Sequence, residues 1–359
     1  MEKKKRQSNI ELLRILAMGG VILLHYNNVN MGGALNSSAG RMNYTILVGL
    51  ESLFIAAVNL FVMITGYFLF RTNKRSIGRA IALIFQTCLF SFVCTALKMA
   101  HGDIPKSSNT LLCASLPLNW FVILYAALYL VSPLLNRAIR GMDNKTLKQV
   151  ILLLVILFSV WPSAVDLLSL LIDNPMRGLS TIGLYGSQRG YTIVQFVLCY
   201  MIGASLNQLT PTDMPKNGLR IGRFPVGKAA LTLCLLALLV IIFVIARYYD
   251  LDIAWAYCSP LIVLEALTIL LLFLQIDLGE NRVINEISTA AFSVYLLHPA
   301  LLQYLRIAEY TQKTIPVMLL HLAVITTGII TISYIVDKIY RILFSPLLRA
   351  SKNWGRYEW

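Results

Sequence analysis

Long apolar segments alternate with short polar segments along most of the 359-residue chain. A helix of about 20 apolar residues crosses a hydrocarbon core about 30 Å thick. The pattern therefore predicts an all-α integral membrane protein, a bundle of about ten transmembrane helices that forms a single domain over residues 1–359. The ten expected spans are residues 9–27, 46–70, 78–99, 115–136, 147–166, 191–208, 228–247, 255–275, 287–305 and 316–343.

The first expected span contains three ionisable residues, Glu11, Arg14 and His25, in an otherwise apolar segment. At about 100° per residue, the step from Arg14 to His25 returns to nearly the same helix face, about 16 Å further along the axis. Glu11 lies one turn before Arg14 on that face. An arginine within a span costs roughly 2.5–3.5 kcal/mol, so it should face the bundle interior and have a partner. The alternative is that Glu11 and Arg14 lie among lipid headgroups while His25 only ends the helix.

The composition argues against a soluble protein. Hydrophobic residues make up 57% of the chain and charged residues 13%, whereas a soluble domain carries about 25% charged residues. The formal net charge of +14 would favour a nucleic-acid partner in a soluble protein. Here Lys and Arg gather in alternate loops, which is the bias of a membrane protein, so no nucleic-acid partner is expected.

Basic residues gather before the first span, after the second, fourth and sixth spans, and at the end of the chain, whereas the loop 276–286 is net acidic. By the positive-inside rule both termini are cytoplasmic, so Arg14 lies near the cytoplasmic surface and His25 near the outer one. The longest outer loops, 28–45 and 167–190, are rich in Gly, Asn and Ser, and they either cover a site or simply connect helices. The residues that set this orientation are Lys3, Lys4, Lys5, Arg6, Arg71, Lys74, Arg75, Arg79, Arg137, Arg140, Lys145, Lys148, Lys216, Arg220, Arg223, Lys228, Arg349, Lys352 and Arg356.

Two histidines are candidates for proton transfer. A neutral imidazole accepts a proton near pH 7 better than any other unperturbed side chain. His25 is the first candidate, and His298 is the second, since the predicted topology puts both near the outer surface. Pro299 lacks an N–H group and is expected to disturb the helix beside His298, whose alternative role is packing. No metal site is expected, because the six cysteines show no ligand spacing.

Three basic residues, Lys74, Arg75 and Arg79, stand at the start of the third expected span. Arg75 and Arg79 are four residues apart, a spacing that places both on one helix face. Arginine binds phosphate through two parallel hydrogen bonds, so the three residues are a candidate phosphate site. The alternative is the ordinary positive charge of a cytoplasmic loop.

Two carboxylates and one polar pair complete the candidates. Glu51 lies near the outer end of the second expected span, and Glu265 lies in the middle of the eighth. A carboxylate within a membrane is a functional candidate, and Glu265 pairs with Arg14, holds a histidine tautomer, or is protonated and structural. Asn119 and Trp120 begin the fourth span at the outer surface, where Trp120 anchors the interface or stacks on a sugar ring.

Four segments resemble the membrane acyltransferase-3 family. The first, IELLRILAMGGVILLHY (10–26), has the family's arginine and histidine separated by ten residues. The second, LFVMITGYFLF (60–70), resembles the end of the family's second span, with Thr65 in place of the common Ser. The others are LNWFVILYAALYLVSPLLN (118–136) and FSVYLLHP (292–299). The four segments follow the family order from one end of the chain to the other.

The resemblance implies a function. The family moves acyl groups, mostly acetyl and sometimes succinyl, from cytoplasmic acyl-CoA to hydroxyl groups of glycans or lipid-linked glycans. It implies that His25 is catalytic and that Arg14 is its essential partner. It also implies an arginine pair at the cytoplasmic start of the third span, although the family's usual spacing is Arg-x-x-Arg, whereas Arg75 and Arg79 form Arg-x-x-x-Arg.

The sequence thus predicts a multi-pass plasma-membrane O-acyltransferase, surrounded by membrane lipids and bacterial in origin. It resembles the stand-alone polysaccharide O-acetyltransferases, which lack an added hydrolase-like domain. Acetyl-CoA is the expected donor substrate, no permanently bound cofactor is expected, and a cell-envelope polysaccharide or lipid-linked glycan precursor is the expected acceptor. The supporting residues are Glu11, Glu51, Glu265 and His298 at the catalytic site, Lys74, Arg75 and Arg79 on the acyl-CoA side, and Asn119 and Trp120 on the acceptor side.

The competing hypothesis is a transporter or exporter of a small molecule or glycolipid. Polar residues on inner helix faces serve transport as well as catalysis. Many transporters, however, have related halves or helices broken at matching places. The sequence shows no such internal repeat.

Overall fold

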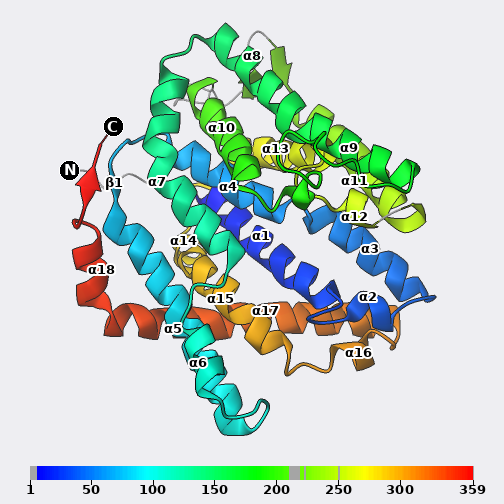
Figure 1. Cartoon of the computed structure of the whole chain (residues 1–359), viewed down its shortest axis with the longest axis vertical. Coiled ribbons are helices and arrows are strands. Elements are labelled where there is room, and N and C mark those ends of the chain that lie inside the picture. The colour runs from blue at the N-terminus through cyan, green and yellow to red at the C-terminus, as the bar shows by residue number, and fades with distance from the viewer. Residues whose placement is uncertain (1–5, 210–218, 222–223, 250, 359) are drawn as a thin grey trace.

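The computed structural model describes residues 6–209, 219–221, 224–249 and 251–358 (Figure 1). Among these residues, seven helical segments are long and apolar enough to cross a membrane. They are Ser8–Asn27 (α1), Met42–Leu69 (α3, Met42–Phe54, and α4, Ala57–Leu69), Ile77–His101 (α5), Trp120–Arg140 (α7), Asn144–Leu171 (α8, Asn144–Val155; a π-helical turn, Ile156–Val160; and α9, Trp161–Leu171), Lys228–Tyr248 (α11) and Ile315–Leu343 (α17). Among the basic loop residues, Lys3, Lys4, Lys5, Lys216 and Arg223 lie outside the described residues.

The prediction of a helical membrane protein is confirmed, whereas the count of ten spans stays a prediction. Two expected spans are shorter apolar helices, Ile193–Leu209 (α10) and Pro260–Leu274 (α13). The ninth is divided into α14 (Arg282–Ile287), a 3-10 turn (Ser288–Ala290) and α15 (Ala291–Leu302). α15 runs through Pro299 and ends at Leu302. Proline removes only the bond to the carbonyl of the fourth residue before it, and α15 ends within one further turn.

Short elements connect the long helices. The strand Arg75–Ser76 (β1) pairs antiparallel with Arg356–Tyr357 (β4), and this pairing joins the C-terminal segment to the start of α5. The remaining elements are the helices Ala34–Ser37 (α2), Ser108–Ala114 (α6), Leu251–Ala254 (α12), Ile307–Tyr310 (α16) and Ser345–Ser351 (α18), the 3-10 turn Gln188–Gly190, and the antiparallel strands Leu219–Ile221 (β2) and Phe224–Val226 (β3).

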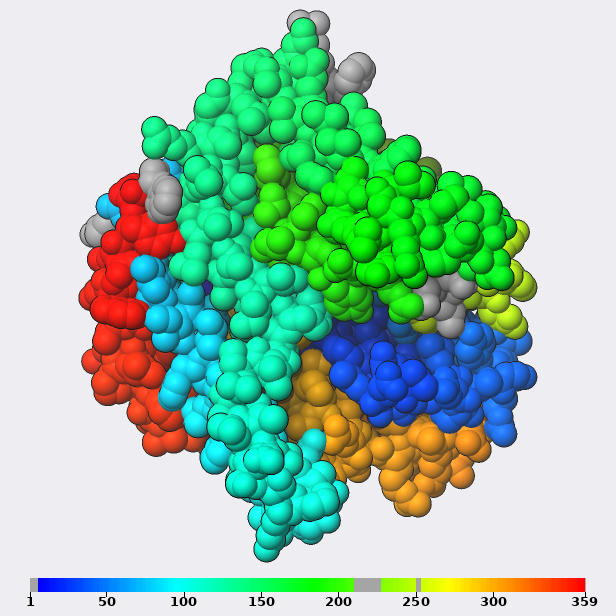
Figure 2. All heavy atoms as spheres, in the orientation of Figure 1, coloured from blue at the N-terminus to red at the C-terminus, as the bar shows by residue number. Residues whose placement is uncertain are grey.

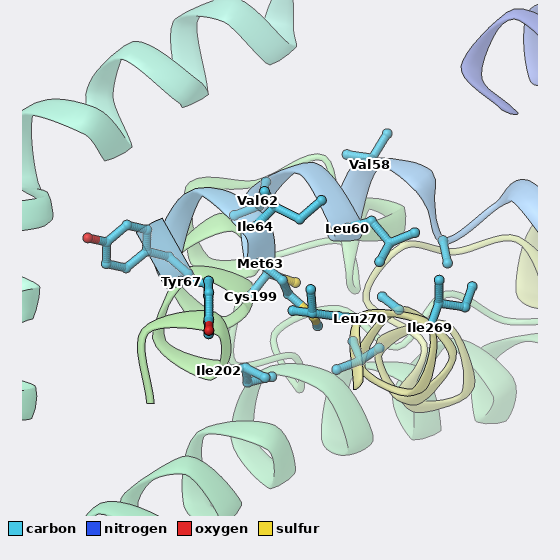
Figure 3. Packing of buried hydrophobic residues seen from close by; sticks show 14 of the residues in the cluster. Val58, Leu60, Val62, Met63, Ile64, Tyr67, Cys199, Ile202, Ile269 and Leu270 are labelled. Atoms are coloured by element: carbon cyan, nitrogen blue, oxygen red, sulfur yellow. The ribbon is translucent and has the colours of Figure 1, made fainter. Parts of the chain in front are cut away.

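The core is built around the close contact of α4 with α10. A Cβ atom on Gly203 would lie 2.0 Å from the carbonyl oxygen of Met63, and one on Gly66 would lie 2.2 Å from that of Tyr200. Small residues let helix backbones approach closely, as is common between membrane helices. α13 and α1 pack against α4 in turn. Figure 3 shows apolar side chains that meet between α4, α10 and α13, among them Met63, Cys199, Ile202 and Leu270.

The outer surface of the bundle is apolar along several helices. Figure 2 shows one face, where α5, α7, α8 and α9 lie at the surface. Large apolar side chains are exposed on these and other helices. Their exposure to water would be unfavourable, whereas contact with lipid suits them. Examples on α8, α11 and α17 are Leu152, Leu153, Leu233, Val240, Leu320 and Ile342.

The two ends of the bundle carry different loops. Both chain termini lie at one end (Figure 1), where Lys74 forms an ion pair with Glu358 at 3.6 Å. The loop that follows α1 lies at the other end, where Asn43 donates a hydrogen bond to the carbonyl of Thr311 at 2.8 Å. The basic loops after α4 and α7 therefore share the end that carries the termini, because Arg140, at the end of α7, bonds to the last turn of α4.

Candidate active site

His25 and His298 meet inside the bundle, near the end opposite the chain termini. Nδ1 of His25 lies 2.6 Å from Nε2 of His298, and the ring centroids are 4.6 Å apart. His298 is buried and His25 partly so. The contact exists because α15 packs along α1, so two segments from opposite ends of the chain place their imidazoles side by side.

The backbone determines the direction of the hydrogen bonds in this pair. Nδ1 of His298 lies 3.1 Å from the carbonyl oxygen of Val294, and this oxygen can only accept a hydrogen bond. With both rings neutral, His298 therefore carries its proton on Nδ1 and accepts at Nε2. His25 must then donate from Nδ1, so its Nε2 retains a free lone pair. This arrangement makes Nε2 of His25 a base held in a defined orientation.

Tyr295 connects the histidine pair to α7. Its ring centroid lies 5.8 Å from that of His298, and its hydroxyl donates to Oδ1 of Asn119 at 3.0 Å. The same oxygen caps α7 by accepting a hydrogen bond from the backbone N–H of Val122 at 3.1 Å. Asn119 thus lies one side chain away from the imidazole pair and joins two helices around it.

Trp120 lies next to this connection, in a cluster of aromatic rings. Its ring centroid is 4.5 Å from that of Tyr191 and 6.3 Å from that of Tyr257, with which it is stacked. Trp120 is 37% exposed, so one edge of the cluster is open at the surface of the molecule. An exposed, braced aromatic ring offers a flat apolar surface to a ligand.

A cavity of about 340 Å³ lies beside α1. Glu11, Arg14, Met18 and Val21 line it, and His25 follows one turn later on the same helix face. The helix face shared by Glu11, Arg14 and His25 therefore lies against a cavity. Arg14 lies at one end of this cavity, and the histidine pair lies beyond its other end. Its other lining residues are Arg6, Val58, Phe61, Thr65, Leu83, Phe121, Tyr125, Ser288, Thr289, Ala291, Phe292, Tyr295 and Arg341.

Arg14 is held in the cavity by two neighbours. Its guanidinium lies 3.2 Å from a carboxylate oxygen of Glu11 and 5.2 Å from the ring centroid of Phe68. The side chain of Arg14 is 29% exposed, whereas that of Glu11 is 9% exposed. The carboxylate therefore orients the arginine, and the guanidinium remains accessible to a ligand.

A second cavity, of about 650 Å³, adjoins the first and reaches toward the chain termini. Leu83, Tyr125, Thr289, Phe292 and Arg341 line both cavities, so the two share a wall. The second cavity is basic, and its charged lining residues are Arg79, Asp337, Arg341, Arg349 and Lys352. The two cavities therefore adjoin each other, between a basic surface and the face of α1 that carries Arg14.

The expectation that Arg75 and Arg79 share a helix face is wrong. Arg75 lies in β1, before α5 begins, because its pairing with β4 keeps the backbone extended. Arg75 is 2% exposed, and its guanidinium donates to Ser132 at 2.7 Å and to three backbone carbonyls. Lys74 forms an exposed pair with Glu358. Of the three basic residues, Arg79 is the one that lines the second cavity.

The two expected carboxylates lie apart from the histidine pair. Glu51 accepts a hydrogen bond from Asn27 at 2.6 Å, and this contact holds the end of α1. Glu265 is fully buried, and neither of its carboxylate oxygens has a hydrogen-bond partner among the described residues. A pairing with Arg14 or a contact with a histidine is therefore wrong for Glu265. The structural interpretation remains for this residue.

Several residues of the site were not predicted individually. Tyr125 and Tyr295 lie within segments that carry the family resemblance, and their helix positions could have identified them. Asp337 and Arg341 form an ion pair at 2.6 Å. The two residues are four positions apart in the last expected span, a spacing from which an ion pair on one helix face could have been predicted. Asp337 also accepts a hydrogen bond from Ser293 at 2.6 Å. These contacts join α15 to α17 beside the cavities.

Apolar helices around cavities lined in part by arginines, together with an imidazole pair between α1 and α15, define an integral membrane protein with a site suited to group transfer. The family model of the acyltransferase domain, acyltransferase-3, matches residues 7–338. The chain therefore belongs to this family and is an acyltransferase, as the resemblance predicted, and the transporter hypothesis is set aside. Comparisons with curated proteins and with solved structures give no match.

Proposed function

We propose that this acyltransferase moves an acetyl group from cytoplasmic acetyl-CoA to a hydroxyl group of a cell-envelope polysaccharide or a lipid-linked glycan precursor. In this proposal it acts in the plasma membrane of a bacterium and crosses that membrane ten times. The observation that carries the proposal is the 2.6 Å contact between His25 and His298, near two adjoining cavities lined in part by arginines, which in this proposal form the route of the donor. The contact provides a base, and the route provides a path for an anionic thioester.

The donor would enter from the end of the bundle that carries the chain termini. Arg79 lies on the wall of the larger cavity, where a guanidinium is suited to phosphate. The pantetheine arm would pass Tyr125 and Phe292, which line both cavities. The thioester would then pass Arg14, whose guanidinium would orient the donor, and reach the histidine pair about 16 Å further along α1.

The acceptor would approach from the opposite end, near Asn119 and the exposed edge of Trp120. Two features support this side. The aromatic cluster around Trp120 offers a stacking surface, and Asn119 is tied to the histidine pair through Tyr295. The basic loops lie at the other end of the bundle. By the positive-inside rule, the end that carries Asn119 and Trp120 would therefore face the outside of the cell.

The transfer step follows from the arrangement of the two imidazoles. Nε2 of His25 takes the proton of the acceptor hydroxyl as that oxygen attacks the carbonyl carbon of the thioester. The carbon–sulfur bond breaks, and the proton passes from His25 to the departing thiolate. His298 accepts the hydrogen bond from Nδ1 of His25 throughout and holds the ring in place. In the covalent variant, the same Nε2 first carries the acetyl group and then yields it to the hydroxyl.

The direct test uses the purified protein in lipid nanodiscs with radiolabelled acetyl-CoA. We expect label in de-O-acetylated polysaccharide, together with release of one free CoA thiol for each acetyl group transferred. Succinyl-CoA in place of acetyl-CoA tests the choice of acyl group. Absence of label in any glycan or lipid-linked glycan offered, with either donor, would contradict the proposal.

A further inference from the structure

The chain after α17 folds back against the start of α5 and the middle of α7. Ser76 donates hydrogen bonds to the carbonyl of Ser351 and, at 2.8 Å, to that of Trp354. The hydroxyl of Tyr357 donates to the carbonyl of Leu130. A Cβ atom on Gly78 would lie 2.6 Å from the carbonyl oxygen of Ser351, so the two backbones are in close contact. The C-terminal segment, residues 345–358, is therefore attached to the bundle.

This attachment places two cations of the C-terminal segment on the wall of the larger cavity. Arg349 and Lys352 line it together with Arg79. All three are exposed, and their side chains make no hydrogen bond or ion pair with another residue that the structure describes. Asp337 is the acidic residue among the described lining residues, and it is already paired with Arg341. The cavity therefore has three cations available to a ligand.

The positive-inside rule accounts for basic residues at this end of the bundle, but not for their convergence on one cavity. Lys145 and Lys148 in α8 belong to the same group of basic loops, yet they do not line this cavity. Arg79 and Arg349 come from segments that the contact of Ser76 with the C-terminal segment brings together. An arrangement of unpaired cations around an interior route suits a ligand with several phosphate groups and a long uncharged arm.

We propose that Arg349 and Lys352 bind phosphate groups of the acyl-CoA donor together with Arg79, so that the C-terminal segment forms one wall of the donor site. The proposal rests on the proposed function and adds residues to it, because the family match ends at residue 338. Coenzyme A carries a diphosphate and a separate phosphate on its ribose. Three cations from two segments that line one cavity can contact these groups while the pantetheine arm extends toward Arg14.

The experiment compares the double variant Arg349→Gln, Lys352→Gln with the control Lys145→Gln, Lys148→Gln, which removes the same charge from the same end of the bundle. Each protein is assayed in phosphatidylcholine nanodiscs with acetyl-CoA and with acetyl-pantetheine, which lacks the phosphate groups. We expect the preference for acetyl-CoA over acetyl-pantetheine to fall about tenfold in the first variant, since charge-assisted hydrogen bonds are lost. The control should keep the preference of the parent protein.

The outcomes separate this proposal from the proposed function. A parent protein that uses neither donor contradicts the proposed function itself. An active parent whose preference survives in the double variant overturns only the role of Arg349 and Lys352. Equal losses with both donors also overturn it, because they indicate a structural defect. The same assay with phosphatidylglycerol added tests lipid phosphate as the ligand, and a variant that changes only the response to this lipid overturns the proposal as well.

Discussion

Nε2 of His298 lies 2.6 Å from Nδ1 of His25, although 273 residues separate the two along the chain. The carbonyl of Val294 orients His298, and His298 in turn orients His25. This chain of hydrogen bonds resembles a catalytic triad, in which a second group orients the base and determines which of its nitrogens carries the proton. Here His25 is the base and His298 is the group that orients it. The difference is that a neutral imidazole and a backbone carbonyl replace the carboxylate.

His25→Ala should remove acyl transfer while leaving insertion into the membrane intact. Loss of a general base typically lowers the rate about 10²–10⁴-fold. A more complete loss, with a labelled acetyl adduct trapped on the parent protein but not on the variant, would identify the covalent route. His321→Phe is the control, because His321 lies outside the imidazole pair: its ring stacks on that of Tyr310, with centroids 3.9 Å apart, and its Nδ1 is hydrogen-bonded to the hydroxyl of Tyr26 at 3.2 Å. Near-normal glycan acetylation by His25→Ala would contradict the mechanism.

His298 is predicted to act as a positioning residue. His298→Phe removes the acceptor for Nδ1 of His25, so kcat should fall by about 10²-fold or more. His298→Gln retains an acceptor oxygen near the position of Nε2 and should recover part of that loss. Because His298 does not line the donor route, KM for acetyl-CoA should change less than kcat in both variants. Equal activity of the Phe and Gln variants would assign His298 to packing.

Arg14 tests the role of a fixed guanidinium. Arg14→Lys keeps the charge but loses the planar group that Glu11 and Phe68 hold in place. Losing a charge-assisted hydrogen bond to the donor costs about 1.5–3 kcal/mol, so we expect Arg14→Gln to lower kcat/KM for acetyl-CoA about 10- to 100-fold. The lysine variant should lie between it and the parent. Transfer from labelled acetyl-CoA at limiting donor concentration measures both variants, and unchanged kcat/KM would remove Arg14 from donor binding.

The close packing of α4 with α10 gives a prediction about stability. A Cβ atom on Gly203 would lie 2.0 Å from the carbonyl oxygen of Met63, so Gly203→Ala must move one helix. Overpacking of this kind costs about 1–3 kcal/mol. Gly328→Ala, in α17, has nothing within 4 Å of the new atom and should have little effect or stabilise slightly. Thermal unfolding in detergent compares the two, and equal Tm values would contradict the argument.

The membrane orientation can be tested by labelling in intact cells. In a background without native cysteines, a single cysteine placed in 28–45 or 167–190 should react with an impermeant thiol reagent. One placed in 71–77 should react only after the membrane is permeabilised, because the basic loops are predicted to be cytoplasmic. Reaction in the reverse pattern would exchange the donor and acceptor sides of the proposed mechanism.

The sequence by itself determined the features that depend on local chemistry. Membrane insertion depends on the apolar content of each segment, so the class of protein followed from hydropathy. The shared face of Glu11, Arg14 and His25 followed from the helical period, which needs no partner helix. The family resemblance followed from short segments whose residues and order are visible in the chain. The division of the ninth span was not visible, because turns between short helices depend on packing.

The tertiary structure decided which polar groups meet. Periodicity places His25 and His298 on their helices, but only the packing of α15 along α1 brings their nitrogens to 2.6 Å. The spacing of Arg75 and Arg79 suggested one helix face, yet the pairing of β1 with a strand some 280 residues later turns Arg75 inward. Such pairings depend on contacts between distant segments, and a local pattern contains no information about them.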